Sequence, residues 1–295
     1  MVFVGKYNWT SISRYTSLEN VYRYLYLPWC RKGLSYNPGI TIDNTAQIDI
    51  HTTHLHGEWD IHGISSTVPI QDIDRHRYIR WNRSSLSRNK GIDIKTLNME
   101  DLDGEFNYLE VSRNIDIQHV LDNPDMKWRR QGLSWNKGIT LDIVRNIHLP
   151  NSYDEWNMVG ISASVPISDV LKNPHLKWDK RGLSCNRGIT IDIIKSDILS
   201  DATGEWNMRD ISRVISLDEV CMYTYIPWDK EGLSMNTAIY LIMDTSLPLS
   251  RSVGEWDYNS IARYVPVYHM RDLHNIEWDR EYISMNKNID PSLLP

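Results

Sequence analysis

The chain has 295 residues, of which 41% are hydrophobic and 24% charged, so it is neither a disordered nor a fibrous protein. Its 32 Lys and Arg residues are outnumbered by 38 Asp and Glu residues, which gives a formal net charge of -6. This balance disfavours nucleic acid as a partner, because such binding depends on neutralising phosphates. The chain contains 12 Trp and 16 Tyr but only 2 Phe. Such a bias predicts that one motif has been copied many times.

The start of the chain, MVFVGKYNWTSISRY, lacks an apolar run of signal-peptide length, and nowhere do 18 uncharged apolar residues follow one another. The cysteines, Cys30, Cys185 and Cys221, share no metal-binding or pairing spacing, which favours a reducing compartment. We therefore expect an intracellular protein that does not associate with membranes.

A segment of 13 residues beginning with Trp recurs along the chain. It reads WCRKGLSYNPGIT at Trp29, WRRQGLSWNKGIT at Trp128 and WDKRGLSCNRGIT at Trp178. Successive copies of this odd series are separated by 52, 47, 50, 50 and 50 residues. The complete odd series begins at Trp29, Trp81, Trp128, Trp178, Trp228 and Trp278. Such a period predicts a repeat protein.

A related even series lies between these copies, with an aromatic residue at position 0, an aliphatic at +5, usually Ser at +6 and an aliphatic at +11. Its copies begin at Trp59, Phe106, Trp156, Trp206 and Trp256, with a shortened copy at Trp9. The chain thus reads as about twelve modules of roughly 25 residues. We expect a single helical-repeat domain over residues 1–295, with double repeats near 1–50, 51–100, 101–148, 149–198, 199–248 and 249–295.

Each module is predicted to be a short helix, a turn and another short helix. Asn136 and Gly138 predict a helix stop in the left-handed conformation, and Thr190 is placed to cap the next helix, with Asp192 in its first turn. Ser168 is placed to do the same in the even series, and Pro174 ends that helix. A strand over residues 188–194 is the alternative, because this run alternates and is rich in β-branched residues. We favour an all-α fold, an α-solenoid of helix-turn-helix modules.

Helices of two or three turns are marginal alone, so neighbouring modules must stabilise them. We expect stacking to bury the tryptophans of both series, which form the repeat core: Trp29, Trp59, Trp81, Trp128, Trp156, Trp178, Trp206, Trp228, Trp256 and Trp278.

An Asn recurs at position +8 of the odd series, two residues after a Ser. Such a ladder could read bases or peptide groups one module at a time. The alternative, which we favour, is that Asn closes the helix while Ser bonds to the turn backbone. This turn ladder comprises Asn37, Asn89, Asn136, Asn186, Asn236 and Asn286.

The signature W-x-x-x-x-L-S-x-N-x-x-I-T, complete at Trp29–Thr41, Trp128–Thr140 and Trp178–Thr190, resembles the Trp/Asn-rich repeat proteins of giant nucleocytoplasmic DNA viruses of the mimivirus-like and iridovirus-like groups. The resemblance covers nearly the whole chain. It implies a helical repeat protein of viral origin, located in the host cytoplasm or the virion, and it implies no particular reaction.

Three recurrent or clustered sets of polar residues invite a functional interpretation. His51, His54 and His56 could hold zinc, but the equivalent stretches elsewhere lack histidine, which favours a solvated loop. The acids before the even aromatics could form a carboxylate row, although we favour first-turn positions stabilised by the helix dipole. They are Glu58, Glu105, Glu155, Glu205 and Glu255. The Lys and Arg residues after the odd tryptophans are interleaved with acids, which indicates a mixed-charge face rather than a nucleic-acid stripe.

Motifs of known catalytic sites are absent from the sequence: it has no H-E-x-x-H, G-x-S-x-G, G-x-G-x-x-G or phosphate-loop motif. We expect no catalytic, cofactor-binding or metal-binding residues. The resulting prediction is a protein–protein interaction or assembly scaffold, whose variable loops at residues 45–56, 97–104, 146–154, 196–204 and 245–254 meet other proteins. The alternatives are a virion structural component, with self-association through end modules, and a helical-repeat nucleic-acid-binding protein.

Overall fold

The structure, a computed structural model, describes residues 2–238, 249, 251–270, 276–287 and 289–291. These residues form an all-helical repeat fold, apart from two short strands, β1 (Val2–Val4) and β2 (Glu277–Asp279). Each described helix is too short to cross a lipid bilayer. The all-α prediction is therefore confirmed, and the strand expected as an alternative over residues 188–194 is instead the start of a helix, α16 (Ile191–Lys195).

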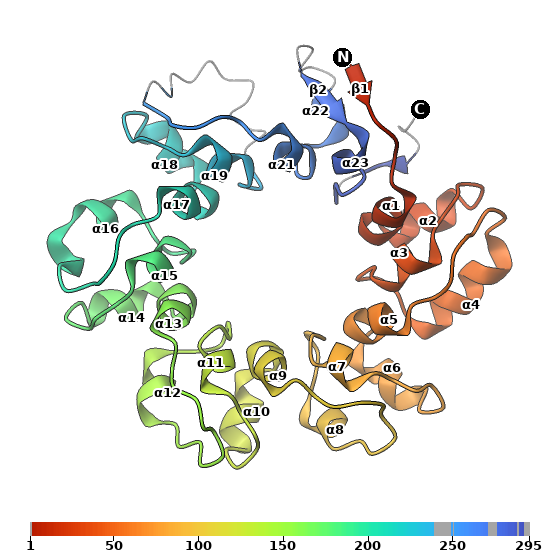
Figure 1. The fold of residues 1–295 in the computed structure, drawn as a ribbon, viewed down its shortest axis with the longest axis horizontal. Helices are drawn as coiled ribbons and strands as arrows, with labels where there is room; N and C mark the ends of the chain where they lie inside the picture. The colour runs from red at the N-terminus through yellow and green to blue at the C-terminus, as the bar shows by residue number, and fades with distance from the viewer. Residues whose placement is uncertain (1, 239–248, 250, 271–275, 288, 292–295) are drawn as a thin grey trace. The chain divides into compact units, whose positions relative to one another are not determined.

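The contacts within the chain divide it into two compact units. Unit 1 comprises Met1–Phe106, Thr237–Leu241 and Asp257–Pro295, and unit 2 comprises Asn107–Asn236 and Ile242–Trp256. Both units are built from the same modules (Figure 1). The single domain over residues 1–295 stays a prediction.

The first helix of each module follows its aromatic residue. In the even series these helices are α1 (Trp9–Tyr15), α5 (Ile61–Thr67), α9 (Tyr108–Asn114), α13 (Met158–Ser164), α17 (Met208–Val214) and α21 (Tyr258–Ala262). In the odd series they are α3 (Arg31–Ser35), α7 (Arg83–Leu86), α11 (Arg130–Leu133), α15 (Lys180–Ser184), α19 (Lys230–Ser234) and α23 (Arg280–Ile283).

A second helix completes each module that the structure describes throughout. The even series has α2 (Leu18–Arg23), α6 (Ile70–Arg75), α10 (Ile117–Asp122), α14 (Ile167–Lys172), α18 (Leu217–Met222) and α22 (Val267–Met270). The odd series has α4 (Ile42–His51), α8 (Ile94–Leu97), α12 (Leu141–Asn146) and α16, which is followed by the 3-10 helix η1 (Asp197–Leu199). The second helices expected after Trp228 and Trp278 fall largely on residues outside the described ranges.

Short polar side chains start most of these helices. Thr190 Oγ1 accepts the backbone N–H of Ile193 at 3.3 Å, as predicted, and Asp192 lies in the first turn of α16. The prediction for Ser168 is wrong, since Pro166 is the N-cap of α14 and Ser168 lies inside the helix. Proline fits there because its fixed φ and missing N–H suit a helix start.

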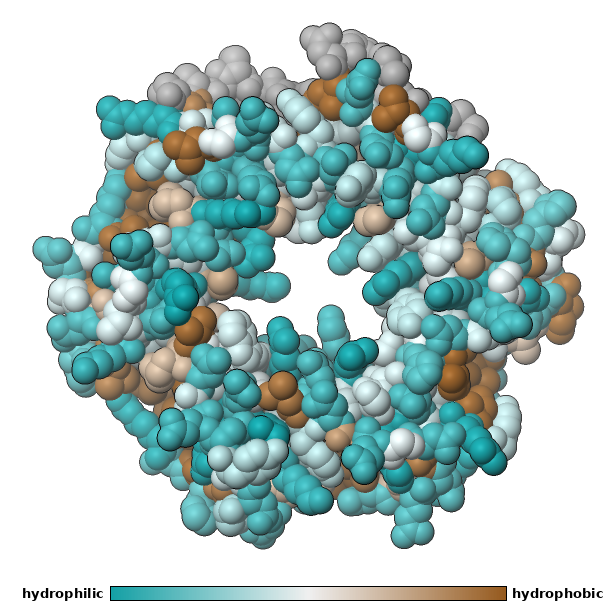
Figure 2. All heavy atoms as spheres, viewed as in Figure 1, coloured by the Kyte–Doolittle hydropathy of each residue, from teal (hydrophilic) through white to brown (hydrophobic). Residues whose placement is uncertain are grey.

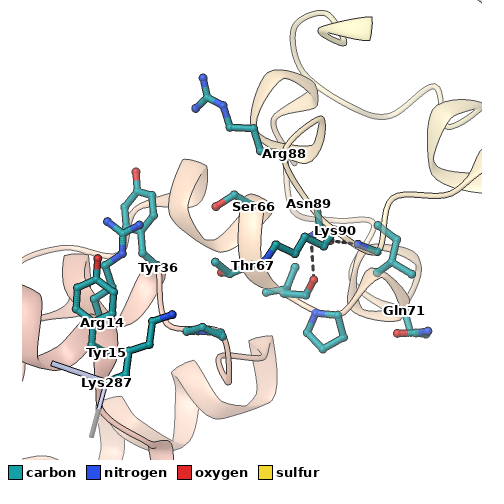
Figure 3. A pocket seen from close by; sticks show the side chains of 15 residues that line it. Arg14, Tyr15, Tyr36, Ser66, Thr67, Gln71, Arg88, Asn89, Lys90 and Lys287 are labelled. Carbon is teal, nitrogen blue, oxygen red and sulfur yellow. Dashed lines mark hydrogen bonds between the residues drawn. The ribbon is translucent and has the colours of Figure 1, made fainter. Parts of the chain in front are cut away.

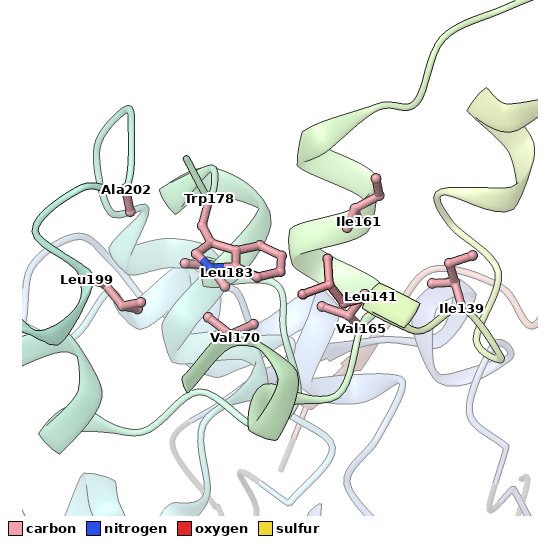
Figure 4. Packing of buried hydrophobic residues seen from close by; sticks show 9 residues of the cluster. All are labelled: Ile139, Leu141, Ile161, Val165, Val170, Trp178, Leu183, Leu199 and Ala202. Atoms are coloured by element: carbon pink, nitrogen blue, oxygen red, sulfur yellow. The ribbon is translucent and has the colours of Figure 1, made fainter. Parts of the chain in front are cut away.

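The odd-series tryptophans form the centre of the core in both units, and all six are 0% exposed. In unit 2, Trp178 packs with Ile161, Val165, Leu183 and Leu199 (Figure 4). Its indole N–H donates to the carbonyl of Asn173 at 2.9 Å, so the polar atom of the ring is satisfied inside the core. Trp29, Trp81, Trp128 and Trp228 bond in the same way to the carbonyl five residues earlier.

The even-series tryptophans are only half-buried, so the expectation that both series are buried alike is wrong for Trp59, Trp156, Trp206 and Trp256. Trp156 and Trp206 pack at the edge of the core around Trp178. The indole N–H of Trp59 donates to the exposed carboxylate of Asp49 at 3.1 Å. These rings cover the core from outside rather than filling it.

A glycine at position +4 in four of the six odd modules lets helices of adjacent modules come close; Ser85 and Tyr282 stand there in the other two. A Cβ built on Gly182 would lie 2.3 Å from the carbonyl oxygen of Val159 and 2.8 Å from the Cβ of Ser162, so only glycine fits between α13 and α15. Gly33, Gly132 and Gly232 meet the preceding even helix in the same way. Sequence reasoning did not assign this role to the glycine.

In unit 1 the N-terminal residues complete the module at Trp278. β1 pairs in parallel with β2, which places Phe3 opposite Trp278 and Val4 opposite Asp279 (Figure 1). Single bridges of the same kind join four other odd modules to the segment that follows each of them. These bridges are Cys30 with His56, Asn82 with Asp103, Asp179 with Thr203 and Asp229 with Val253.

The position of these bridges shows which aromatic residue begins the first module. A glycine with positive φ follows each bridge, and Gly5, at φ 76°, takes this place after β1. Tyr7, two residues later, therefore corresponds to the even aromatics, and Ile12 and Ser13 fall at +5 and +6. The guanidinium of Arg280 donates to the carbonyl of Gly5 at 3.2 Å, as Arg31 and Arg83 do to Gly57 and Gly104. The prediction of a shortened copy at Trp9 is wrong, because this module is full length.

The module at Trp128 replaces the backbone bridge with a carboxylate. Asp154 accepts the backbone N–H groups of Arg130 at 3.0 Å and Gln131 at 2.9 Å, and the hydroxyl of Ser152 at 2.9 Å. The carboxylate also lies 3.2 Å from the Arg129 guanidinium. Burial raises the pKa of Asp154, but these hydrogen bonds outweigh it and leave the pKa below its usual value.

We expect Asp154→Asn to lower the free energy of unfolding by about 1–2 kcal/mol at pH 7, since it replaces a charged acceptor. Because the folded-state pKa of Asp154 is lowered, its contribution is present above the unfolded value of about 3.9 and is lost as the pH falls below it. Urea melts of both proteins between pH 7 and pH 3 measure this, and the two stabilities should converge at the acid end. An equal gap at pH 7 and pH 3 would contradict the assignment.

Candidate binding surfaces

The Asn ladder binds backbone groups of the preceding module. Asn186 Nδ2 donates to the carbonyls of Ser162 and Val165, both at 2.9 Å, and its Oδ1 accepts the N–H of Gly188 at 2.9 Å. The six ladder residues are 0–6% exposed, so they are not offered to a ligand. The other five make the same pair of carbonyl contacts: Asn37, Asn89, Asn136, Asn236 and Asn286.

The left-handed conformation predicted for these Asn residues is wrong. Positive φ occurs only at glycines among the described residues, and Gly138 is not one of them. The turn is closed by the Asn side chain instead, which bonds to the N–H two residues on. Glycine is needed at position 138 for space, since a Cβ there would lie 2.7 Å from Ile117 Cγ2.

The serines two residues before each Asn also join modules. Ser184 Oγ donates to the carbonyl of Lys180 at 2.7 Å and accepts the N–H of Asn207, the N-cap of α17, at 2.9 Å. The even-series Ser162 accepts the N–H of Asp179 at 3.0 Å. The repeated Asn and Ser side chains are thus used to hold one module against the next.

The recurrent glutamates are exposed and lie before the helices rather than in their first turns, so that prediction is wrong. Glu205 precedes the N-cap Asn207 by two residues.

The cations after the odd tryptophans have a structural use that the sequence did not indicate. The guanidinium of Arg31 donates to the carbonyl of Gly57 at 3.1 Å, and that of Arg130 donates to the carbonyl of Ser152 at 3.0 Å, so each fastens the loop that follows.

No group of three potential metal ligands occurs in the part of the chain that the structure describes. His51 and His54 are exposed on and after the end of α4, whereas His56 bonds through its backbone to Trp29 and Arg31. The cysteines are far from equivalent: Cys30 is buried, Cys185 half-buried and Cys221 exposed.

Large hydrophobic side chains are exposed in four of the five segments predicted to be loops, although the prediction is wrong for residues 45–51, which belong to α4, and for residues 197–199, which form η1. Ile50 is 76% exposed, Tyr153 80%, Ile198 51% and Val253 49%. In the loop at residues 97–104, by contrast, Met99 and Leu102 are buried. Half of the segment at residues 245–254 lies outside the described ranges. Figure 2 shows apolar residues as small groups separated by hydrophilic ones on the face in view.

A basic hollow of about 800 Å³ lies in unit 1, lined by the ends of α1 and α5, the start of α6, and the turns after α3, α7 and α23. Its cations are Arg14, Arg88, Lys90 and Lys287, and no carboxylate lines it. In Figure 3, Lys90 extends toward Thr67, while Arg88 extends outward at the rim. The volume is in the range of sites that hold small molecules or short peptides.

Two tyrosines of the hollow, Tyr15 and Tyr36, already contact the guanidinium of Arg14. The Arg14 guanidinium lies 5.4 Å from the ring centre of Tyr15 and 5.0 Å from that of Tyr36. The hydroxyl of Tyr36 donates to Asp60 at 3.0 Å, and burial together with this bond raises the pKa of Tyr36. Arg14 is thereby held in place with its N–H groups near the opening.

These cations do not stand just after the odd tryptophans, where the sequence shows cations interleaved with acids. A usable signal lies further along each module, at +7 of the even series and at +7 and +9 of the odd series. These positions carry nine cations and no acid in the printed sequence: Arg14, Arg88, Lys90, Arg113, Lys137, Arg187, Arg213, Arg263 and Lys287.

Comparisons with protein-family models, with curated proteins and with solved structures gave no match. The function is therefore argued from the surfaces described above.

Proposed function

We propose that the chain is a non-enzymatic protein–protein interaction or assembly scaffold of a large DNA virus, built as an α-solenoid and acting in the host cytoplasm or the virion. The viral assignment rests on the resemblance of the W-x-x-x-x-L-S-x-N-x-x-I-T modules. The interaction role rests on the distribution of side chains in the structure.

The observation that carries the proposal is the exposure of large hydrophobic residues where one module ends and the next begins. Ile50 at the end of α4, Tyr153 in a loop and Ile198 in η1 are each more than half exposed. Exposed side chains such as Ile50 and Ile198 contribute little to a module's own stability, whereas the Tyr153 ring also stacks with the Arg129 guanidinium, and exposed apolar groups are common at sites of protein contact. The odd-series Trp residues and the ladder Asn residues, in contrast, are buried.

Self-association through end modules has less support than partner binding. In unit 1 the backbone of Val2–Val4 pairs with Glu277–Asp279, and the N–H of Asn8 donates to Ser284 Oγ at 2.9 Å. These contacts occupy the edge of the module at Trp278 that would otherwise receive the next copy. We therefore place partner binding on the loops.

The test is affinity capture of the wild-type chain and of Ile50→Ser/Tyr153→Ser/Ile198→Ser from infected cells. We expect the wild type to retain a stoichiometric protein partner and the triple variant to lose at least about nine-tenths of it, because hydrophobic side chains at the centre of an interface carry most of its affinity. Binding should be reproduced with the purified partner.

The matched control is Leu121→Ser/Leu171→Ser/Met222→Ser, which removes three exposed apolar side chains from the helices α10, α14 and α18. It should keep the partner, and thermal melts should show that both variants remain folded. Equal loss of the partner in the two variants would place binding elsewhere. Recovery of the chain only from purified particles, with no soluble partner, would favour a virion structural component.

A further inference from the structure

We propose that the basic hollow of unit 1 binds a short peptide segment that carries neighbouring anionic groups, either clustered carboxylates or phosphates. This rests on the proposed function and names the chemistry of one partner segment. The supporting juxtaposition is that four cations, one from α1, two from the turn after α7 and one from the turn after α23, surround one opening with no carboxylate in the lining.

The four cations are available to a ligand. Arg14, Arg88, Lys90 and Lys287 are all exposed, and in the described part of the chain none of them forms an ion pair. Like charges gathered without counterions repel one another, and an anionic ligand would relieve that repulsion. The guanidinium groups of Arg14 and Arg88 can also pair with carboxylate or phosphate oxygens in the bidentate manner.

The cations at the same repeat positions in unit 2 lie beside carboxylates in two cases. A smaller hollow in unit 2, lined by α9 and α11, has Arg113 but also Glu110, and its volume is about 190 Å³. Elsewhere in unit 2, Arg213 lies 3.1 Å from Asp210 and is therefore neutralised by its own helix. The repeat register alone thus does not create an anion site.

A peptide fits the lining better than a nucleic acid does. Bases bind to proteins largely by stacking on open aromatic faces, but Arg14 lies against both tyrosine rings of the hollow. The wall also contains Pro38, Pro69 and Ile70, which suit the aliphatic parts of a peptide, and polar residues such as Ser66 and Thr67. The net charge of the chain, -6, also opposes extended contact with a polyanion.

The experiment measures the binding of three labelled probes to the full chain by fluorescence anisotropy at low salt. They are a peptide with six consecutive Glu residues, a peptide with two neighbouring phosphoserines, and a ten-nucleotide poly-U RNA. We expect saturable binding of at least one anionic peptide, weakened by added NaCl as screening requires, and the two peptide arms identify which anion is preferred.

The test variant is Arg88→Glu/Lys90→Glu. Both side chains are exposed on either side of the buried Asn89, so the charge reversal leaves the contacts of Asn89 to Ser65 and Val68 in place. We expect its affinity for the peptide to fall by about tenfold or more. The control is Lys127→Glu/Lys177→Glu, which makes the same change in net charge at exposed sites of unit 2 and should bind as the wild type does.

Three results would overturn the proposal: no binding of either peptide, equal weakening by the control variant, or tighter binding of the RNA that the Arg88→Glu/Lys90→Glu change abolishes. Thermal melts establish that each variant is folded. None of these results bears on the capture experiment with Ile50→Ser/Tyr153→Ser/Ile198→Ser. A failure of peptide binding at the hollow can therefore be distinguished from a failure of the proposed scaffold function.

Discussion

Replacing Trp178 with alanine is expected to lower the free energy of unfolding by about 3–5 kcal/mol, the usual loss when a fully buried large aromatic is truncated. The side chain is 0% exposed and packs against Val165, Leu183 and Leu199, which come from different modules or from different parts of one module. Those neighbours cannot move in to fill the space without breaking the Asn and Ser contacts between modules. The cavity should therefore persist.

The substitution also leaves the carbonyl of Asn173 without its 2.9 Å hydrogen bond from the indole. Trp178→Phe keeps a six-membered ring in the core but removes the N–H together with the second ring, so it should cost less than Trp178→Ala, about 1–3 kcal/mol. Urea melts followed by circular dichroism give all these values. Glu205→Ala, at an exposed position before α17, serves as the control and should change stability by less than about 0.5 kcal/mol.

A neutral Trp178→Ala would mean that the indole does not hold adjacent modules together. A loss as large for Trp206→Ala as for Trp178→Ala would contradict the difference between the two series. Trp206 is half-buried at the edge of the same core, so we expect a distinctly smaller effect there.

The sequence predicts those parts of the fold, the helices and the repeat period, that depend on repeated local signals. The capping Thr140 and Thr190, the first-turn acid Asp192 and the period near 50 residues predict helical modules, and the helices lie where these signals place them. Local signals act within about four residues, so one module contains all the information needed to find its own helices.

Contacts between modules could not be predicted in this way. The Asn186 side chain contacts residues 21 and 24 positions earlier, and nothing in its own turn indicates this reach. The role of Tyr7 was missed because its equivalence depends on pairing between β1 and β2, which are separated by most of the chain. The basic hollow combines Arg14, Lys90 and Lys287 from three separate modules for the same reason.

Replacing Asn186 with alanine is expected to cost about 3–5 kcal/mol, nearly as much as the loss of the core tryptophan. The change removes two hydrogen bonds to buried carbonyls and one from the N–H of Gly188, and each buried polar group left without a partner costs about 1–3 kcal/mol. The site is 4% exposed, so water replaces these bonds poorly. Asn146→Ala, at an exposed Asn that ends α12, is the matched control and should cost less than about 1 kcal/mol.

Asn186→Asp distinguishes the donor role of this side chain from its size. The aspartate keeps an acceptor for Gly188 but places carboxylate oxygens against the carbonyls of Ser162 and Val165, where the amide donates in the wild type. Repulsion disfavours the charged form, so the folded-state pKa of this aspartate should be raised above about 3.9. Its destabilisation should therefore be smaller in acid, where the protonated carboxyl donates one hydrogen bond in place of the amide's two, and should grow as the pH rises above that value. Urea melts at pH 4 and pH 7 measure the difference, and equal destabilisation at both would show that these carbonyls do not depend on the amide.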